Sequence, residues 1–281
     1  TNVLQANQLK GLTTDQLSLL GTQAIQKLTS DQVKLLDAKQ LAGLGSNQTQ
    51  ALGDDVTVLS ATQIKGLGTS QIQALTTDQV ADLSAAQIKG LTTAQIAAIE
   101  TQDLVKLGTD QLAALSAAQV KALSTGQVQS LGTDQVKGLQ GTQIAALSTD
   151  QIRVLGTAQI ANLETSQIKA LTAAQLGAMS TSQIAAIETQ DLEQLTAAQI
   201  KGLTTDGVKA LTTGQIGAMK YAQIAALSTD QIAQVSTGGI AQLSTDQVKA
   251  LTAAQLGALS TSQIAAIETQ DLVELTAAQL K

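Results

Sequence analysis

An apolar residue returns at every eighth position of this chain, and this period limits the folds that the chain can adopt. From Leu59 to Leu275 the spacing holds without a slip over 27 consecutive octads, and Ile, Val or Leu follows five residues after each apolar residue. The consensus octad is Leu-Ser/Thr-Thr-Asp/Ala-Gln-Ile-x-Ala, and its fifth position is Gln in 22 of the 27 octads. Self-similarity this dense predicts an array built from one small repeated unit.

The same octad extends toward the N-terminus, from Leu4 to Leu52. The step from Leu52 to Leu59 is one residue short, and it is the only break in register. We therefore expect residues 1–281 to form a single continuous repeat array with one slip. The chain lacks an initiator Met and stops within an octad, which is typical of a segment of a longer chain.

A longer period lies over the octads. Residues 170–201 and 250–281 are nearly identical, and the two segments lie ten octads apart. Repeat arrays accept duplication of whole blocks because each unit contacts mainly its neighbours.

Neither a long helix nor a strand suits an eight-residue period. At about 100° per residue, eight residues overshoot two helical turns by about 80°, so an apolar stripe would wind around a continuous helix. In a strand, apolar residues spaced five and then three apart would point to opposite faces. The octad is nevertheless rich in Ala, Gln and Leu, which favour helix.

One short helix per octad fits the pattern. In Leu227-Ser228-Thr229-Asp230-Gln231-Ile232, Ser228 can be the N-cap and Gln231 the third helical residue, which together form a capping box. Leu227 and Ile232 then occupy the two positions of a hydrophobic staple. The cap could also lie one residue later, because the third octad position is always Thr where the second is Gly or Glu, as at Gly108. We predict an all-α solenoid of very short helices.

The pattern leaves two possibilities for the number of octads in each coil of the solenoid. Basic residues at the seventh octad position fall mostly in alternate octads, which predicts two octads per coil. Three octads per coil is the competing geometry, indicated by Gly108, Gly132 and Gly156, which are spaced three octads apart. The basic residues are Lys65, Lys89, Lys121, Lys137, Arg153, Lys169, Lys201, Lys209, Lys249 and Lys281.

Composition excludes most site chemistry. The chain has no Cys, His, Trp, Phe or Pro and a single Tyr. It therefore has no thiolate nucleophile, no ordinary zinc site, no Ser-His-Asp triad and no aromatic platform for bases. The interpretation is that the chain is not an enzyme and has no catalytic, cofactor-binding or metal-binding residues, no cofactor and no small-molecule substrate.

Charge and hydropathy restrict the partners further. The net charge is −6, from 16 basic and 22 acidic residues, and such a chain has no general attraction for nucleic acid. No run approaches the ~18 apolar residues of a membrane span, so we expect no membrane insertion. The expected partners are copies of the chain itself or further repeats of the same chain.

Two sets of charged residues are the remaining candidates for a site. The pairs Glu100/Asp103, Glu188/Asp191 and Glu268/Asp271 could act as an acid and base or bind a hard cation, but two carboxylates in a first helical turn also complement the helix dipole. The basic residues of the seventh position could meet an anionic polymer, or could lie near helix C-termini on a solvated edge. We favour the structural interpretation for both, and regard Tyr221 as incidental.

The repeats resemble those of a known class. The strings LTTAQIAAI (91–99), LSTDQIRVL (147–155) and LTAAQLGAM (171–179) are similar to tandem repeats of very large secreted bacterial exoproteins, labelled adhesin-like, haem-utilisation or biofilm and surface-filament proteins. The resemblance implies secretion, a location outside the cell or on the bacterial cell surface, and a structural or adhesive role. It carries no haem ligand, because Met179 and Met219 are both in core register.

These observations predict a structural rod that forms or extends a surface fibre, sheath or adhesin stalk. The alternatives are a protein-binding solenoid scaffold and an ice-binding array of Thr and Ala, whose Thr column is interrupted at Ala85, Ala117, Gly141 and Tyr221.

Burial follows from the same register. We expect Leu155 and Ile160 to be fully buried in the core. At the ends, where Leu4, Leu9, Leu275 and Leu280 keep the apolar register, we expect exposed apolar surface that stacks copies head to tail.

Overall fold

The computed structural model describes residues 5–280, which fold into successive short helices without any strand. Contacts within the chain define two units, one ending at Leu139 and the other beginning at Gln140. We call them unit 1 and unit 2. No helix in the described part of the chain has both the length and the apolar character needed to cross a bilayer.

Each helix of unit 1 has four to six residues and occupies one octad. They are α1 (Ala6–Gly11), α2 (Thr14–Ser18), α3 (Thr22–Ile25), α4 (Ser30–Val33), α5 (Ala38–Ala42), α6 (Ser46–Gln50), the 3₁₀ helix η1 (Gly53–Val58), α7 (Ala61–Lys65), α8 (Thr69–Gln73), α9 (Thr77–Ala81), α10 (Ala85–Gly90), α11 (Thr93–Ala98), α12 (Thr101–Leu104), α13 (Thr109–Ala113), α14 (Ala117–Ala122), α15 (Thr125–Ser130) and α16 (Thr133–Lys137).

Unit 2 repeats the same design. Its helices are α17 (Gly141–Ala146), α18 (Thr149–Arg153), α19 (Thr157–Ala161), α20 (Thr165–Ala170), α21 (Ala173–Ala178), α22 (Thr181–Ala186), α23 (Thr189–Leu192), α24 (Ala197–Ile200), α25 (Thr205–Lys209), α26 (Thr213–Ala218), α27 (Tyr221–Ala226), α28 (Thr229–Ile232), α29 (Thr237–Ile240), α30 (Thr245–Lys249), α31 (Ala253–Ala258), α32 (Thr261–Ala265) and α33 (Thr269–Leu272).

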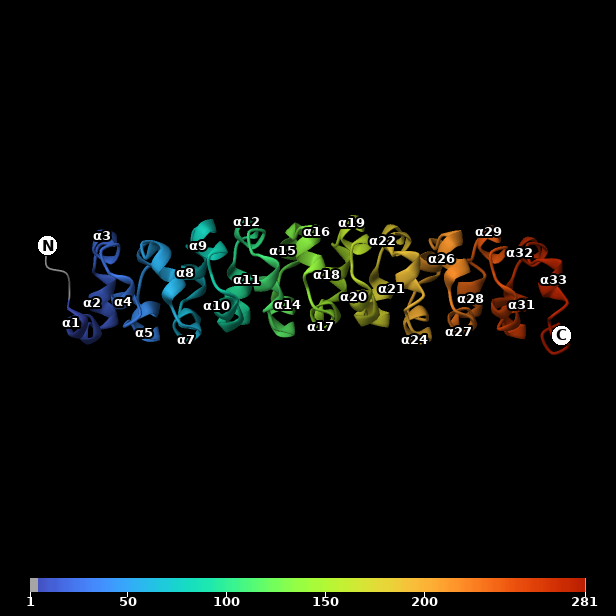
Figure 1. The fold of residues 1–281 in the computed structure, drawn as a ribbon, viewed down its shortest axis with the longest axis horizontal. Helices are drawn as coiled ribbons and strands as arrows, with labels where there is room; N and C mark the ends of the chain where they lie inside the picture. Colours follow the sequence, from blue (N-terminus) through green and yellow to red (C-terminus); the bar gives the residue numbers. More distant parts are fainter. Residues whose placement is uncertain (1–4, 281) are drawn as a thin grey trace. The chain divides into compact units, whose positions relative to one another are not determined.

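Within each unit, from α2 on, helices pack against the helix three places further along the chain. In unit 1, α7 packs on α10 and α10 on α13; in unit 2, α17, α18 and α19 pack on α20, α21 and α22. Within each unit the helices advance coil by coil in chain order (Figure 1). A coil therefore holds three octads. The all-α solenoid is confirmed, but the prediction of two octads per coil is wrong, and the competing geometry of three is the correct one.

The N-cap lies at the second octad position. The Ser228 hydroxyl accepts a hydrogen bond from the N–H of Gln231 at 3.1 Å, and Gln231 Oε1 accepts one from the N–H of Ser228 at 2.8 Å, which confirms the predicted capping box. Gly108 is also an N-cap, and its N–H donates to Gln111 Oε1 at 2.6 Å. A cap at the third position is therefore wrong, because the Gln that completes the box fixes the cap three residues before it.

The apolar residues of octad positions 1 and 6 form the core. Leu155 and Ile160 are 4% and 1% exposed, as expected, and Leu227 and Ile232 of the staple are buried as well. Met179 and Met219 occupy core positions too, and both are buried. A helix of four to six residues is too short to be stable alone, so its stability depends on this shared core.

The short octad at the register break forms η1 instead of an α-helix. It begins at Gly53, whose φ of 55° lies in the left-handed region, and it has no Gln. Val56 of η1 is fully buried, and η1 packs against α4 and α9, three places before and three places after it. The register break thus shortens one octad by one residue, and each coil still contains three helices.

Small residues at the eighth octad position let adjacent coils approach in unit 1. A Cβ atom added at Gly90 would lie 2.7 Å from the Cβ of Ala61 in the coil before, and one added at Gly66 would lie 2.7 Å from the Cβ of Ala38. Gly138 meets Thr109 in the same way. Such separations are too short for two methyl groups, so glycine is required there.

Candidate functional site

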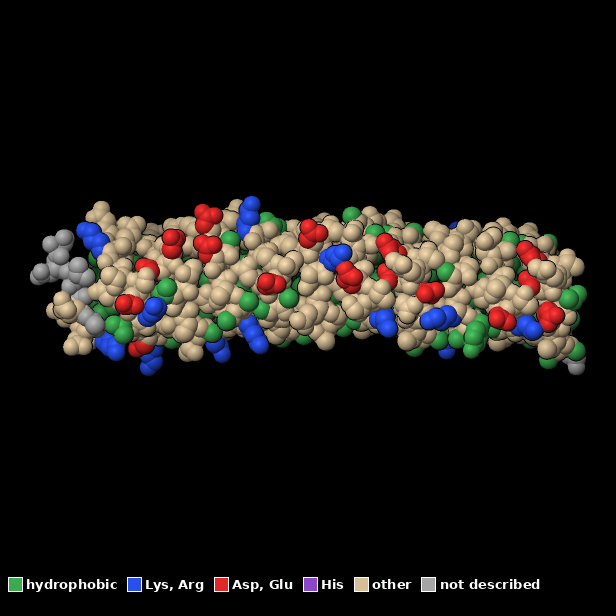
Figure 2. All heavy atoms as spheres, in the orientation of Figure 1, with side chains coloured by type: hydrophobic (Ala, Val, Ile, Leu, Met, Phe, Trp, Pro, Cys, Tyr) green, Lys and Arg blue, Asp and Glu red, His purple; other side chains and the backbone are tan. Residues whose placement is uncertain are grey.

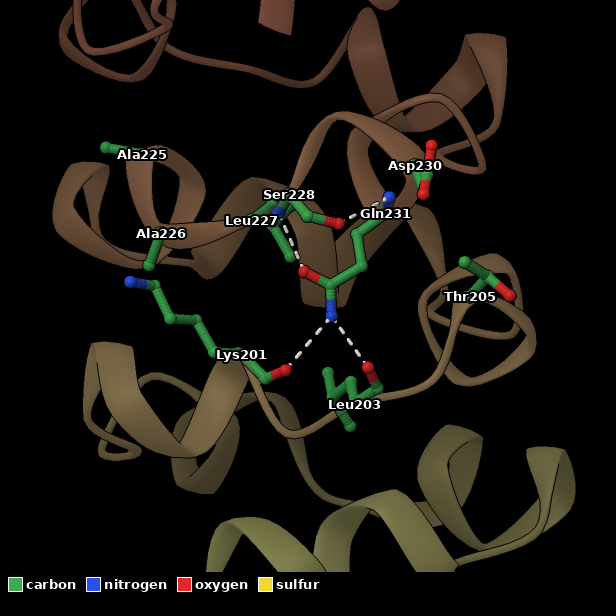
Figure 3. A pocket seen from close by; sticks show the side chains of 9 residues that line it. All are labelled: Lys201, Leu203, Thr205, Ala225, Ala226, Leu227, Ser228, Asp230 and Gln231. Carbon is green, nitrogen blue, oxygen red and sulfur yellow. Dashed lines mark hydrogen bonds between the residues drawn. The ribbon is translucent and has the colours of Figure 1, made fainter.

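The fifth-position Gln links each octad to the coil before it. In α22, Gln183 Nε2 donates to the backbone carbonyls of Ile152 at 2.8 Å and Leu155 at 2.7 Å. The same side chain accepts the N–H of Ser180 on Oε1 at 2.8 Å. We call this arrangement the glutamine clamp: one amide caps its own helix and bonds two carbonyls one coil earlier. Figure 3 shows the clamp of Gln231 on Lys201 and Leu203.

The clamp satisfies polar groups that short helices leave unpaired. An α-helix leaves its first N–H groups and its last carbonyls without partners, and a helix of one turn consists almost entirely of such groups. Gln183 satisfies an N–H at the start of its own helix and carbonyls at the end of another. It is 2% exposed, and no buried side-chain polar atom in the described chain lacks a partner.

All the clamps that we observe point the same way along the chain. Where a clamp does not cross the register break, its Nε2 atom donates to the residue 28 positions earlier and to one 30 or 31 positions earlier, as for Gln95 on Leu67 and Ile64, and for Gln231 on Leu203 and Lys201. Gln71 spans the one short octad, from Leu52 to Leu59, so its separations fall to 27 and 30 residues, and its partners Leu44 and Leu41 keep the same octad positions. Each coil therefore presents amide donors toward the preceding coil and carbonyl acceptors toward the following one.

Aspartate replaces the clamp residue in three octads. Asp103, Asp191 and Asp271 are 2–3% exposed, and each accepts a hydrogen bond at 2.6 Å from a Thr hydroxyl one coil earlier. The donors are Thr77, Thr165 and Thr245. A carboxylate cannot donate to the carbonyls that a Gln amide would reach, so the link between coils is reversed in these octads.

A family model whose description is the ALTTAQ repeat matches this chain. It matches at residues 53–85, 96–133, 130–165, 155–186, 184–221 and 224–261, which together make up most of the sequence. The chain belongs to the ALTTAQ repeat family. No curated protein matches it.

The letters of the ALTTAQ repeat correspond to structural positions of the octad. In the segment Ala74–Gln79, with sequence ALTTDQ, the first residue is the eighth position of the preceding octad and Leu75 is a core residue. Thr76 is the N-cap, and Gln79 is the clamp, with Nε2 bonded to the carbonyls of Gln50 and Gly53. The tandem repeat region predicted from the sequence is thereby confirmed.

The glutamates and aspartates of the three carboxylate pairs have different hydrogen-bond partners. Glu100, Glu188 and Glu268 are exposed N-cap residues, and each accepts a hydrogen bond from the side chain of the Gln two residues later. The aspartates lie in the first helical turn and face the preceding coil. Among the described residues, no three acidic side chains gather as metal ligands. The cross-coil hydroxyl was not foreseen, because its donor lies in the preceding coil and is remote in sequence.

The basic residues of the seventh position lie in the last turn or at the C-cap of their helices, as predicted. Lys65, Lys137 and Lys169 are examples in last turns, and Lys201 is a C-cap. Cations there favour the negative end of the helix dipole. Lys281 lies outside the described residues. On the face shown in Figure 2, charged side chains are scattered over both units among uncharged groups and form no single patch.

One of these basic residues forms an ion pair with a residue of another coil. Lys249 Nζ lies 2.9 Å from Glu274 Oε2. The hydrogen bond with Glu274 raises the pKa of Lys249, and the same bond lowers the pKa of Glu274.

A surface hollow of about 590 Å³ lies in unit 2 between α24 and α25 on one side and α27 and α28 on the other. Its polar residues include Lys201, Asp230, Ser228 and Gln231. The Ser228 hydroxyl serves the cap and the Gln231 amide serves the clamp. The Lys201 ammonium and the Asp230 carboxylate point away from each other (Figure 3). The hollow therefore brings no reactive groups together.

Tyr221 is the first residue of α27 and is 62% exposed.

The strongest candidates for a function in this ALTTAQ array are the repeated polar side chains that join one coil to the next.

Proposed function

We propose that this ALTTAQ array is a structural part of a secreted bacterial surface protein, where it forms or extends a fibre, sheath or adhesin stalk. It catalyses no reaction and binds no cofactor, nucleic acid or small-molecule substrate. The chain is a repetitive structural scaffold, and the glutamine clamp is the observation that carries the proposal. A polar residue repeated in nearly every octad is used to hold neighbouring coils together.

The proposed location outside the cell rests on the sequence. The repeats resemble those of large secreted adhesin-like exoproteins, and the absence of Cys means that the array needs no particular redox environment. A surface stalk also has to keep its length, and a directional hydrogen bond between coils supports that role.

Assembly by end stacking needs a different chemical basis from the one first expected. Leu9 and Leu275 are 0% and 9% exposed, so the expectation of exposed apolar residues is wrong for both, because both belong to the buried core. Leu280 is 67% exposed, as expected, and Leu4 lies outside the described residues. Hydrophobic stacking alone is therefore a weak basis for assembly.

The first coil of unit 1 instead offers amide donors. Gln8 and Gln16 are exposed; their Oε1 atoms accept the N–H groups of Gln5 and Thr13, and their Nε2 atoms meet no acceptor within residues 5–280. The clamp geometry supports the proposal that their partners are the carbonyls of a further coil of the same repeat, in the same chain or in a second copy.

The test is the mass distribution of the 281-residue protein, measured by mass photometry and electron microscopy. We expect end-to-end oligomers that fall to single particles in Gln8→Ala/Gln16→Ala, while the control Gln129→Ala, at an exposed seventh position, keeps them. Oligomers unchanged by the double substitution would place the contact on a side face, and monomers of the wild-type chain would rule out end stacking. Antibody labelling of intact cells tests the proposed location: label confined to permeabilised cells would contradict it.

A further inference from the structure

Three octads per coil allow three clamps between successive coils. The coil of α26–α28 has all three, because Gln215, Gln223 and Gln231 each donate to carbonyls one coil earlier. The coil of α29–α31 has two, from Gln247 and Gln255. At least two clamps also hold the coil of α20–α22, and two hold the coil that contains α32 and α33, from Gln263 and Gln279.

The coil of α23–α25 has one clamp. Its three fifth-position residues are Asp191, Gln199 and Gly207. Gln199 donates to the carbonyls of Lys169 at 3.1 Å and Leu171 at 2.6 Å, but it is partly exposed, whereas Gln183 and Gln215 on either side are 2% and 1% exposed. Exposure to water weakens the net contribution of such a bond.

The two replacements restore little of the lost bonding. Asp191 accepts one hydroxyl bond from Thr165 at 2.6 Å. Gly207 is capped by Thr204, whose hydroxyl accepts its N–H at 3.0 Å, but it has no side chain to reach the coil before. The backbones also approach closely in this step: a Cβ added at Gly177 would lie 2.5 Å from the carbonyl oxygen of Gly202, and one added at Gly202 would meet Ala173.

We infer that α23–α25 separates from α20–α22 more readily than α26–α28 separates from α23–α25, or α29–α31 from α26–α28. The missing clamps of Asp191 and Gly207 coincide in one coil, so the array contains a preformed opening point at residues 187–210. A scaffold with such a step yields at one defined place when it is loaded or heated, and it closes again by re-forming a single clamp. This property is independent of where the array is located and of what it assembles with.

Native-state hydrogen exchange on the whole chain, read by mass spectrometry, tests the inference. Local opening exposes amides in proportion to its equilibrium constant. We expect residues 187–210 to have protection factors about tenfold lower than residues 211–234, the size of effect that one or two missing net hydrogen bonds give. Equal protection in the two segments would overturn the inference.

Gly207→Gln is the matched gain-of-function variant. The nearest neighbour of an added Cβ is a side-chain atom, Thr204 Oγ1 at 3.3 Å, which has to shift by a few tenths of an ångström. Met179 in the preceding coil holds the position to which a clamp donates. We expect protection of residues 187–210 to rise about tenfold. Gly207→Ala is the control, since it also restricts the backbone but adds no clamp. An equal rise in both variants would show that the clamp does not govern the step.

Gln199→Ala keeps the test decisive if Gly207→Gln disturbs packing. It removes the one clamp of this coil, so we expect protection to fall in residues 187–210 and to stay unchanged in residues 255–275. A fall spread evenly over unit 2 would contradict a local opening point.

Discussion

At the scale of the residue, one glutamine side chain combines two tasks that proteins usually divide. Gln183 caps its own helix through Oε1 and bonds the carbonyls of Ile152 and Leu155 through Nε2. The capping task was predictable, because Ser/Thr-x-x-Gln is a local pattern. The second task was not predictable in the same way, because its partners lie in another coil and their identity depends on the number of octads per coil.

We expect Gln183→Ala to lower the free energy of unfolding of unit 2 by about 2–4 kcal/mol, the sum of two buried cross-coil bonds and part of a cap. Urea denaturation followed by circular dichroism measures the change. Gln234→Ala, at an exposed eighth position in the same unit, is the control and should stay within about 0.5 kcal/mol. Similar losses in both variants would mean that the clamp contributes nothing specific.

At the scale of the element, the sequence predicted the short helix but not the size of the coil. Cap, staple and clamp residue lie within one octad, so the helix could be derived from neighbouring positions. The alternation of Lys residues misled, because the Lys side chains of the seventh position are exposed and packing does not restrict them. The more informative signal was at the eighth position, where Gly66, Gly90 and Gly138 recur at whole multiples of three octads and lie against the preceding coil.

The octads with Asp at the fifth position also show that contacts between coils could not be predicted from neighbouring residues. The first-turn location of Asp103 was predictable from helix electrostatics. Its burial and its bond to Thr77 were not, because the donor lies in another coil and becomes a neighbour only once three octads close a turn.

The ion pair between coils gives a prediction about pH. The hydrogen bond with Lys249 lowers the pKa of Glu274 from its usual 4.5. A lowered carboxyl pKa stabilises the fold above the unfolded-state value, and this stabilisation is lost as pH falls through the folded-state value. In an NMR titration, Glu274 should therefore ionise below pH 4.5 in the wild type and close to 4.5 in Lys249→Met. An identical midpoint in both would show that the pair does not form in solution.

At the scale of the whole molecule, stability is shared among neighbouring coils instead of being local to one helix. Leu155 belongs to the core of unit 2, and its carbonyl is one of the acceptors of the Gln183 clamp. A change there affects the packing of one coil and its link to the next.

We expect Leu155→Asp to destabilise unit 2 by more than about 3 kcal/mol, because it buries an unpaired charge among aliphatic side chains. Lys169→Ala, at an exposed seventh position, should change the melting temperature little. Thermal melting by circular dichroism distinguishes the two. Equally small effects would contradict the assigned core.

Three octads per turn also determine what duplication does to the surface of unit 2. The copied segments 170–201 and 250–281 lie ten octads apart, which is three full turns and one third of another. The identical helices α21 and α31 therefore face different directions around the axis of their unit, and a ligand-binding face would be scattered by each such event. The clamp is the same in all three places of the turn, so it survives copying. Duplication can therefore lengthen the array by any whole number of octads. It preserves the links between coils, but it does not keep copied residues on the same face of the array.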